Sequence, residues 1–263
     1  MKSIPETRAD AAEDKPRPDR RQNILDASQR LFARFGYHAV TIRQIAEEAQ
    51  VPLALVGYYF GQKQELYDAV FGHWSGTVAQ RSVDLRNALA QSSGDRLQRI
   101  VAAMVNPIVG LRSSPQGAAY ALFVTRGLSQ QSVEEDRAIR EYFDPVAAEF
   151  IDAIRDALAA DYPGHTHAHA AWGFQFALGA LLHFLSDQRV ARLSNGANVP
   201  GDPAVAQQLI AFIAHGLRGA AQAFVAASAA AGDVSSAHVA AAGKPNEPDK
   251  PGKHNNTPAH AEA

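Results

Sequence analysis

The sequence predicts an all-α protein, with a small three-helix domain at the N-terminus and a larger helical bundle after it. Three observations support this class. Apolar residues recur at helical spacing through most of residues 20–228. Alanine, which has the highest helix propensity, is abundant. No segment shows the strict apolar–polar alternation that is typical of a half-buried strand.

Length and composition limit the function classes. The chain has 263 residues, enough for one small and one medium domain. Its formal net charge of -2 argues against a protein that coats nucleic acid by bulk charge, so DNA binding would need a local basic patch. The absence of cysteine excludes disulfides and thiolate metal sites. We expect no cofactor.

The two ends of the chain lack helical periodicity. Residues 1–19 are charged and contain prolines, which predicts a disordered arm. They contain no apolar signal-peptide core, so we expect a cytoplasmic protein. Residues 229–263 are rich in Ala, Pro, Lys, Asn and His, which predicts a disordered tail. The apolar stretch from Ala168 to Leu185 is short for a membrane span, and we expect a buried helix and no membrane partner.

Two helix signals follow the arm. Ile24, Ala27 and Leu31 lie on one helical stripe, and Gly36 can adopt the left-handed conformation that ends a helix. Thr41, with Gln44 three residues later, forms the capping-box pattern that begins a second, short helix.

A third short helix is predicted from Pro52 to about Tyr59, because proline suits the first turn of a helix. Gly61 ends it. Two short helices joined by a tight turn are the helix-turn-helix plan, in which the second helix enters the major groove of DNA.

The stretch from Arg21 to Tyr67 closely resembles the DNA-binding domain of the TetR family of repressors. It reads RQNILDASQRLFARFGYHAVTIRQIAEEAQVPLALVGYYFGQKQELY. The resemblance implies that residues 20–66 form a helix-turn-helix domain, and that the chain is a homodimeric repressor of palindromic double-stranded operator DNA. A small-molecule effector would release the operator.

The expected DNA contacts lie in the second and third helices. Thr41 sits at a helix N-terminus, where free N–H groups suit a phosphate. Arg43 is placed for a phosphate or a base edge, and the resemblance implies that Tyr58, Tyr59 and Lys63 clamp backbone phosphates. The other expected contacts belong to the recognition helix and are apolar: Pro52, Leu53, Ala54, Leu55 and Gly57. Apolar residues read thymine methyl groups only, so we expect specificity to depend on Arg43 and on DNA shape.

Residues 67–228 are expected to form the ligand-binding and dimerisation domain. Its helices are predicted at Lys63 to Leu89, Leu97 to Leu111 with a kink at Pro107, Ser114 to Leu128, Glu134 to Ala160, Ala168 to Val190 and Pro203 to Ala227. Segments 123–158 and 172–193 weakly resemble a TetR subgroup that includes regulators of fatty-acid metabolism, which makes an acyl ligand conceivable.

Large aromatic residues in this domain predict a pocket for an apolar or aromatic effector. The candidate lining residues are Asn106, Tyr120, Phe123, Arg126, Tyr142, Phe143, Phe150, Trp172 and Phe176. The alternative is that the aromatics fill the core and that Arg126 pairs with Glu134 or Glu135.

The last two predicted helices carry broad apolar faces suited to an intersubunit four-helix bundle. The residues on these faces are Leu178, Leu181, Leu182 and Leu185 on one helix and Leu209, Ile210, Phe212, Ile213 and Leu217 on the other. Glycines and alanines on both helices permit close backbone approach. A dimer would hold two recognition helices about 34–36 Å apart, the spacing of successive major grooves.

Two other functions stay open. An activator or dual regulator would use the same DNA-binding domain, since operator position decides the outcome. A metal sensor or metal-dependent enzyme would use His165, His167 and His169, although no carboxylate motif accompanies them and we expect no metal site. Signatures of other enzyme classes, such as a phosphate-binding loop or a nucleophile elbow, are absent from the sequence, so we expect no enzyme activity.

Overall fold

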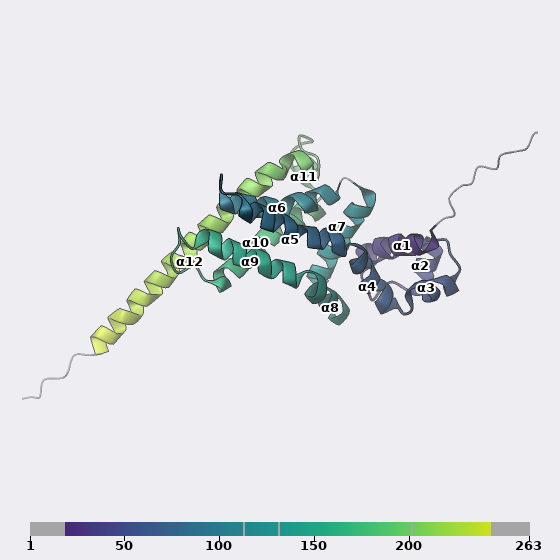
Figure 1. Cartoon of the computed structure of the whole chain (residues 1–263), viewed down its shortest axis with the longest axis horizontal. Coiled ribbons are helices and arrows are strands. Elements are labelled where there is room, and N and C mark those ends of the chain that lie inside the picture. Colours follow the sequence, from purple (N-terminus) through teal and green to yellow (C-terminus); the bar gives the residue numbers. More distant parts are fainter. Residues whose placement is uncertain (1–18, 113, 131, 201, 243–263) are drawn as a thin grey trace, which may run out of the picture.

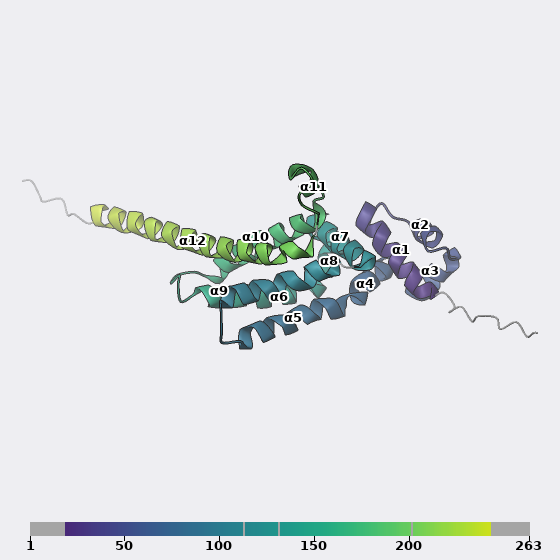
Figure 2. The same ribbon diagram turned by 90° about the horizontal axis from the view of Figure 1, so that it is seen from above.

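The computed structural model describes residues 19–112, 114–130, 132–200 and 202–242. Within these ranges every regular element is a helix, which confirms the all-α class. A small group of helices lies at one end of the molecule and a larger bundle forms its body (Figure 1). The last helix runs along the bundle and projects beyond it at the opposite end, as the view from above also shows (Figure 2).

The small group contains α1 (Arg20–Phe35), α2 (Ile42–Glu48), α3 (Leu53–Phe60) and α4 (Lys63–His73). The body contains α5 (Ser75–Ala90), α6 (Arg96–Leu111), α7 (Pro115–Gln130), α8 (Val133–Tyr142), α9 (Asp144–Leu158), α10 (His167–Ser186), α11 (Val190–Leu193), a single 3-10 turn η1 (Pro203–Val205) and α12 (Ala206–Ala242). The predicted order of helices is therefore correct, but two helix breaks and the chain end differ from the prediction.

The predicted connecting helix from Lys63 to Leu89 is wrong, because the helix breaks at Trp74. This residue leaves the helical region, with φ -100° and ψ 4°. Its side chain is held by tertiary contacts on both sides, a hydrogen bond to Gln29 and a stacked contact with Tyr120. The apolar spacing continues across the break, so periodicity alone does not reveal it.

The predicted helix from Glu134 to Ala160 is also two helices, with the break at Phe143. Pro145 lies in the first turn of α9, where its missing N–H has no intrahelical partner to lose. In a continuous helix the N–H at this position would donate to the carbonyl one turn earlier, and proline has no N–H. The chain therefore starts a new helix there.

At the C-terminal end, α12 continues to Ala242, whereas the sequence predicts a disordered tail from residue 229. The alanine-rich composition that follows Ser228 has high helix propensity, which favours continuation of the helix. Residues 243–263 and the predicted arm up to residue 18 lie outside the described residues.

Two hydrophobic cores organise the fold. One is built from α5, α6, α9, α10 and α12, with Ile100, Phe150 and Leu181 completely buried. The other begins in the small group with Ile24 and Ile45, and it continues into α7 and α8. Its buried residues on these two helices are Tyr120, Phe123, Val124 and Ala138. The small group is therefore packed on the body through α1 and α7 rather than attached by a free linker.

One described helical segment, Pro203–Ser228, is long and apolar enough to cross a membrane by length and composition. In this fold it packs against α6 and α10, and its inner residues Ile210, Ile213 and Leu217 are buried in the bundle core. The expected apolar helix at Ala168 to Leu185 is α10.

Candidate nucleic-acid interface and effector cavity

The helix-turn-helix is held together by local hydrogen bonds. The N–H of Gln44 donates to the Thr41 hydroxyl oxygen at 3.2 Å, and the N–H of Thr41 donates to the Gln44 side-chain oxygen at 2.8 Å. This reciprocal pair is the predicted capping box. The Thr41 hydroxyl also donates to the same Gln44 oxygen at 3.0 Å. In the turn between α2 and α3, the N–H of Val51 donates a hydrogen bond to the Ala46 carbonyl at 3.0 Å.

Helix α3 is anchored on one side and open on the other. Val56 and Phe60 are buried in the small core. Leu53 and Tyr58 are 47% and 79% exposed, and Ala54, Gly57 and Tyr59 are exposed with them. Leu55 is only half-buried, so it is the least accessible of the predicted base-reading residues. Pro52 caps the helix instead of occupying its first turn, with φ -55° and ψ 136°.

Gly57 lies in the middle of this open face. A Cβ atom built on Gly57 would meet no atom within 4 Å. The fold of the protomer therefore does not require glycine here, although glycine costs helix stability relative to alanine.

Basic side chains surround α3 unequally. Arg43 is exposed on α2, and the Arg21 guanidinium lies over the Phe60 ring at 5.0 Å from its centroid. Arg30 is neutralised by Glu48 at 3.0 Å. Within the described residues Arg20, Arg21 and Arg43 are exposed and make no ion pair, so the positive charge available to a phosphate in this region lies on these three.

Lys63, the first residue of α4, is placed differently from the prediction of an open phosphate clamp. Its ammonium lies over the Tyr37 ring, 4.4 Å from the centroid. The side chain is half-buried, and desolvation lowers the pKa of Lys63, while the negative charge of Glu134 acts in the opposite direction. A phosphate contact by Lys63 would require the ammonium to leave or share this ring.

A partly open cavity lies in the body, between α5, α6, α7, α9 and α10. It contains about 870 Å³ of space not filled by protein atoms, its open mouth included. Its walls are mainly apolar, and its polar lining residues are Thr77, Arg81, Tyr120, Asp144 and Gln175. An apolar lining with a few polar side chains is typical of a small-molecule site.

Of the predicted ligand residues, only Tyr120 and Phe143 line this cavity. Phe123 and Phe150 are buried in the two cores, and Asn106 is exposed. Tyr142 stacks on Phe71 at 5.9 Å. These placements correct the prediction: helical spacing identifies an apolar face but not which part of it borders a void.

Arg126 does not line this cavity either. Its guanidinium donates to the backbone carbonyls of Arg34 and Phe35 at 3.3 and 3.2 Å. These carbonyls are at the end of α1 and have no intrahelical partners there. The alternative pairing with Glu134 or Glu135 is also wrong, and Arg126 instead ties α7 to α1.

Arg81 is the cavity residue that the prediction missed. It lies on α5 and is 8% exposed. The sequence carried a signal for it, because Arg81 occupies the same helical stripe as the buried residues Val78, Ser82 and Leu85. A charged residue on an apolar stripe is a candidate for a buried functional group.

The cavity wall is connected to the small group through aromatic contacts. Tyr120 stacks on Trp74 with ring centroids 4.7 Å apart and an interplanar angle of 12°. The side-chain amide of Gln29 on α1 donates to the Gln116 carbonyl on α7 at 2.7 Å. The helix break at Trp74 thus lies between the cavity and α1.

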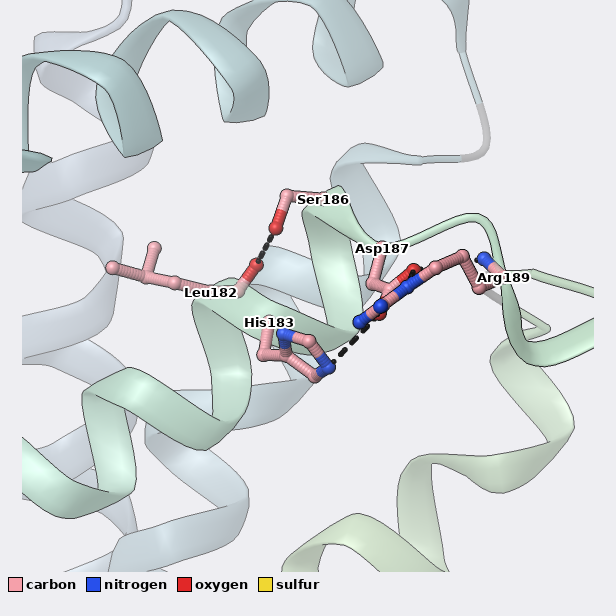
Figure 3. Close-up of polar contacts among 5 residues, drawn as sticks. All are labelled: Leu182, His183, Ser186, Asp187 and Arg189. Atoms are coloured by element: carbon pink, nitrogen blue, oxygen red, sulfur yellow. Dashed lines mark hydrogen bonds and ion pairs between the residues drawn. The ribbon is translucent and has the colours of Figure 1, made fainter. Parts of the chain in front are cut away.

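A polar cluster holds the end of α10, next to the cavity residue Leu182. Asp187 accepts hydrogen bonds from Arg189 and lies 3.1 Å from the His183 ring nitrogen Nε2. The hydrogen bond from Arg189 is the main reason that the pKa of the Asp187 carboxyl is well below its usual value. Figure 3 shows the Leu182 side chain pointing away from this cluster, while Ser186 donates to the Leu182 carbonyl at 2.8 Å. The cluster therefore fixes the turn that leaves α10.

The predicted dimer faces need correction. Leu181, Leu185 and Leu217 are buried within the protomer, as are Ile210 and Ile213. The exposed apolar residues on α10 and α12 are instead Trp172 at 59%, Phe176 at 57% and Phe212 at 68%. Phe176 and Phe212 line a shallow apolar groove between the two helices, together with Gly173, Ala177, Ala180, Ile213, Gly216, Leu217 and Ala220. We call this surface the α10–α12 face.

The histidine cluster does not form a three-ligand site. The rings of His165 and His169 have centroids 5.7 Å apart, but His167 lies 3.3 Å from Asp152 instead. His169 stacks on Phe224. No group of three or more His, Cys, Asp or Glu side chains in the described part of the chain could hold a metal ion, so this alternative gains no support.

Comparisons with known proteins agree with this arrangement. Residues 24–70 match the model described as bacterial regulatory proteins, tetR family, and residues 102–216 match a tetracyclin repressor-like C-terminal domain. The HTH-type transcriptional regulator BetI of Brucella anthropi is 34% identical over 126 residues, covering 48% of this chain and 62% of BetI. The match thus spans less than two thirds of that relative.

Solved structures share the fold. NalD of Pseudomonas aeruginosa, the secondary repressor of the MexAB-OprM multidrug efflux pump, aligns with a TM-score of 0.53 and 21% identity, covering 75% of this chain and 96% of NalD. PfmR of Thermus thermophilus, a TetR family transcriptional regulator, aligns with a TM-score of 0.52 and 16% identity, covering 73% and 94%. With both its N-terminal and its C-terminal parts matched by models of one family, the chain belongs to the TetR family.

Proposed function

We propose that this protein is a transcriptional repressor that binds an operator as a homodimer and is released from it by a small-molecule effector. The observation that carries the DNA-binding part is the open face of α3. Val56 and Phe60 hold one side of this helix in the core, while Leu53, Gly57 and Tyr58 are presented to solvent beside Arg43. An α-helix with one free face and nearby cations suits a major groove.

The α10–α12 face supports the homodimer. Trp172, Phe176 and Phe212 are large apolar side chains, and each is more than half exposed in the isolated protomer. Clustered exposed aromatics mark interaction surfaces. Gly216 and Gly219 on α12 have open space where a Cβ would lie, so a helix of a second copy can approach closely. A second copy of this chain would place α10 and α12 against α10 and α12 in a four-helix interface.

The cavity supports an effector. It shares Tyr120 with the aromatic contacts that reach α1, so a molecule in the cavity would press on the same side chain that supports Trp74. An effector acts only through its different affinities for the DNA-competent and the released states. We expect the α4–α5 break to differ between these states.

The test of DNA binding is a selection of random double-stranded DNA by the full-length protein, followed by affinity measurement on the enriched sequence. We expect an inverted repeat whose half-sites are about one helical turn apart. Arg43→Ala should lower the affinity for the operator and alter the selected sequence. Arg86→Ala is the matched control, because Arg86 is an exposed arginine on α5, outside the small group.

An enriched sequence without inverted symmetry would contradict the homodimeric arrangement. Equal effects of Arg43→Ala and Arg86→Ala would contradict the assignment of the α3 face. Salt dependence provides a second measure, because each lost phosphate contact lowers the slope of log affinity against log salt by about one.

A further inference from the structure

The guanidinium of Arg81 is a buried cation without a counterion. Its side chain leaves α5 toward the cavity and is 8% exposed, and the Nε atom has no hydrogen-bond partner. No ion pair joins Arg81 to a carboxylate in the described part of the chain. Arginine is almost never this buried unless it is paired.

Tyr120 presents a second unsatisfied group to the same cavity. It is 3% exposed, and its hydroxyl has no hydrogen-bond partner. A buried polar group without a partner is destabilising, and such groups in native structures call for an explanation. Two unsatisfied donors on α5 and α7 therefore border one void.

Other contacts of Arg81 do not replace a counterion. The guanidinium lies 5.7 Å from the centroid of the Phe150 ring, which offers a weak cation–π contact. Burial lowers the pKa of Arg81 to about 10, which still leaves it charged at neutral pH. Asp144, the acidic residue of the cavity lining, is exposed on α9 and makes no ion pair with Arg81.

The remaining walls are apolar. They include Val78, Ile108, Val124, Phe143, Phe174 and Leu182. Such a lining stabilises a hydrocarbon or aromatic body by removing it from water. A ligand in this cavity therefore needs a negative charge only beside Arg81.

We propose that the cavity binds an organic monoanion: an apolar body that carries one carboxylate, which accepts hydrogen bonds from the Arg81 guanidinium and the Tyr120 hydroxyl. The carboxylate supplies the missing counterion, and charge-assisted bonds of this kind are among the strongest in proteins. The negative charge of Asp144 on the lining disfavours a ligand with a second anionic group. This inference rests on the proposed function only in taking the cavity as the effector site.

The test measures direct binding by calorimetry to the full-length protein, with two pairs of probes matched in shape. One pair is decanoate and 1-decanol, and the other is 4-phenylbutyrate and 4-phenylbutan-1-ol; decylamine adds a cation of the same length as decanoate. The variants are Arg81→Met, which keeps an unbranched apolar stem but removes the charge and the donors, and Arg86→Met on the exposed side of α5 as the control.

We expect at least one carboxylate to bind more tightly than its alcohol by roughly tenfold or more, the usual effect of a charge-assisted hydrogen bond. Arg81→Met should abolish this preference while leaving the alcohol's affinity within about twofold, and Arg86→Met should leave both unchanged. The proposal is overturned if neither carboxylate binds, if an alcohol or decylamine binds as tightly, or if Arg81→Met keeps the preference.

Operator affinity is measured separately on the same preparations, so the two proposals can fail independently. Carboxylate binding without any operator binding would contradict the repressor function but support the anion site. Operator binding that persists while no carboxylate binds would contradict the anion site alone.

Discussion

The indole N–H of Trp74 donates a 2.6 Å hydrogen bond to the side-chain oxygen of Gln29. This bond joins the break between α4 and α5 to the first helix of the small group. The ring of the same indole stacks on Tyr120 in the cavity wall. One side chain therefore contacts both Tyr120, a residue of the cavity wall, and Gln29 on the first helix of the small group.

Trp74→Phe keeps an aromatic ring but removes the indole N–H. It should destabilise the protein by about 1–3 kcal/mol, because the Gln29 oxygen loses its donor. Gln29→Met removes the acceptor at similar volume. Denaturant unfolding of the two variants and of the double variant measures the interaction, and we expect a coupling of at least about 0.5 kcal/mol. Additive effects would show that the bond contributes nothing.

Thr41→Ala should destabilise the protein by about 0.5–2 kcal/mol, since it removes the side-chain cap of α2. It should also weaken operator binding, because α2 sets the position of α3. Thr41→Ser retains the hydroxyl and is the control, with stability close to that of the parent. A Thr41→Ala variant as stable as Thr41→Ser would contradict the role of the cap.

Gly57→Ala should have opposite effects on folding and on DNA binding. Because a Cβ at Gly57 meets nothing within 4 Å, alanine should stabilise α3 by roughly 0.5–1 kcal/mol. The added methyl projects from the proposed DNA-binding face, so operator affinity should change by several-fold. Gly76→Ala on α5, also in open space, should leave operator affinity unaltered. Thermal unfolding and fluorescence anisotropy measure the two effects.

Phe212→Lys should convert the proposed dimer to a monomer, because it places a charge on the apolar α10–α12 face. Loss of the second half-site should then lower operator affinity by about a hundredfold or more. Leu193→Lys is the matched control, since Leu193 is an equally apolar residue that is 71% exposed outside this face. Sedimentation analysis that finds both variants dimeric would refute the proposed interface.

Arg81→Met should stabilise the ligand-free protein at pH 7 by on the order of 1–3 kcal/mol, because it replaces an unpaired buried charge with an apolar side chain. The pH dependence gives an independent check. The folded-state pKa of Arg81, about 10, is below its usual value, so the unfolded chain binds more protons between the two values. The penalty in the parent protein is complete below pH 10 and is relieved as the pH rises above it.

The advantage of Arg81→Met should therefore shrink above pH 10. Unfolding by urea at pH 7, 9 and 10.5 compares the two proteins under identical conditions. A variant less stable than the parent at pH 7 would indicate that Arg81 has a partner inside the protein.

Much of the small group could be predicted from the sequence, because its signals are local. The Thr41 and Gln44 capping box is contained in four residues, and Gly36 and Gly61 both adopt positive φ where their helices end. The exposed character of Tyr58 also follows from its place opposite Val56 and Phe60 on one short helix. Hydrogen bonds within a few residues of one another need no knowledge of the rest of the fold.

The cavity and the α10–α12 face could not be predicted in the same way. Leu181, Leu217 and Phe212 all fit the apolar stripes predicted from the sequence. Leu181 and Leu217 are buried within the protomer, whereas Phe212 is 68% exposed. Trp172 was expected in the ligand pocket and lies on the surface. Periodicity says that a helix has an apolar face, but neighbouring helices decide which part of it they cover.

The sequence by itself thus determined the class of the protein, the order of its helices and the capped helix-turn-helix, because these depend on propensity and short-range bonds. Only the tertiary structure decided where the helices break, which aromatics remain exposed and that Arg81 faces a cavity without a counterion. These features arise when segments distant in the chain, such as α1, α5 and α7, pack together and enclose or leave open the space between them.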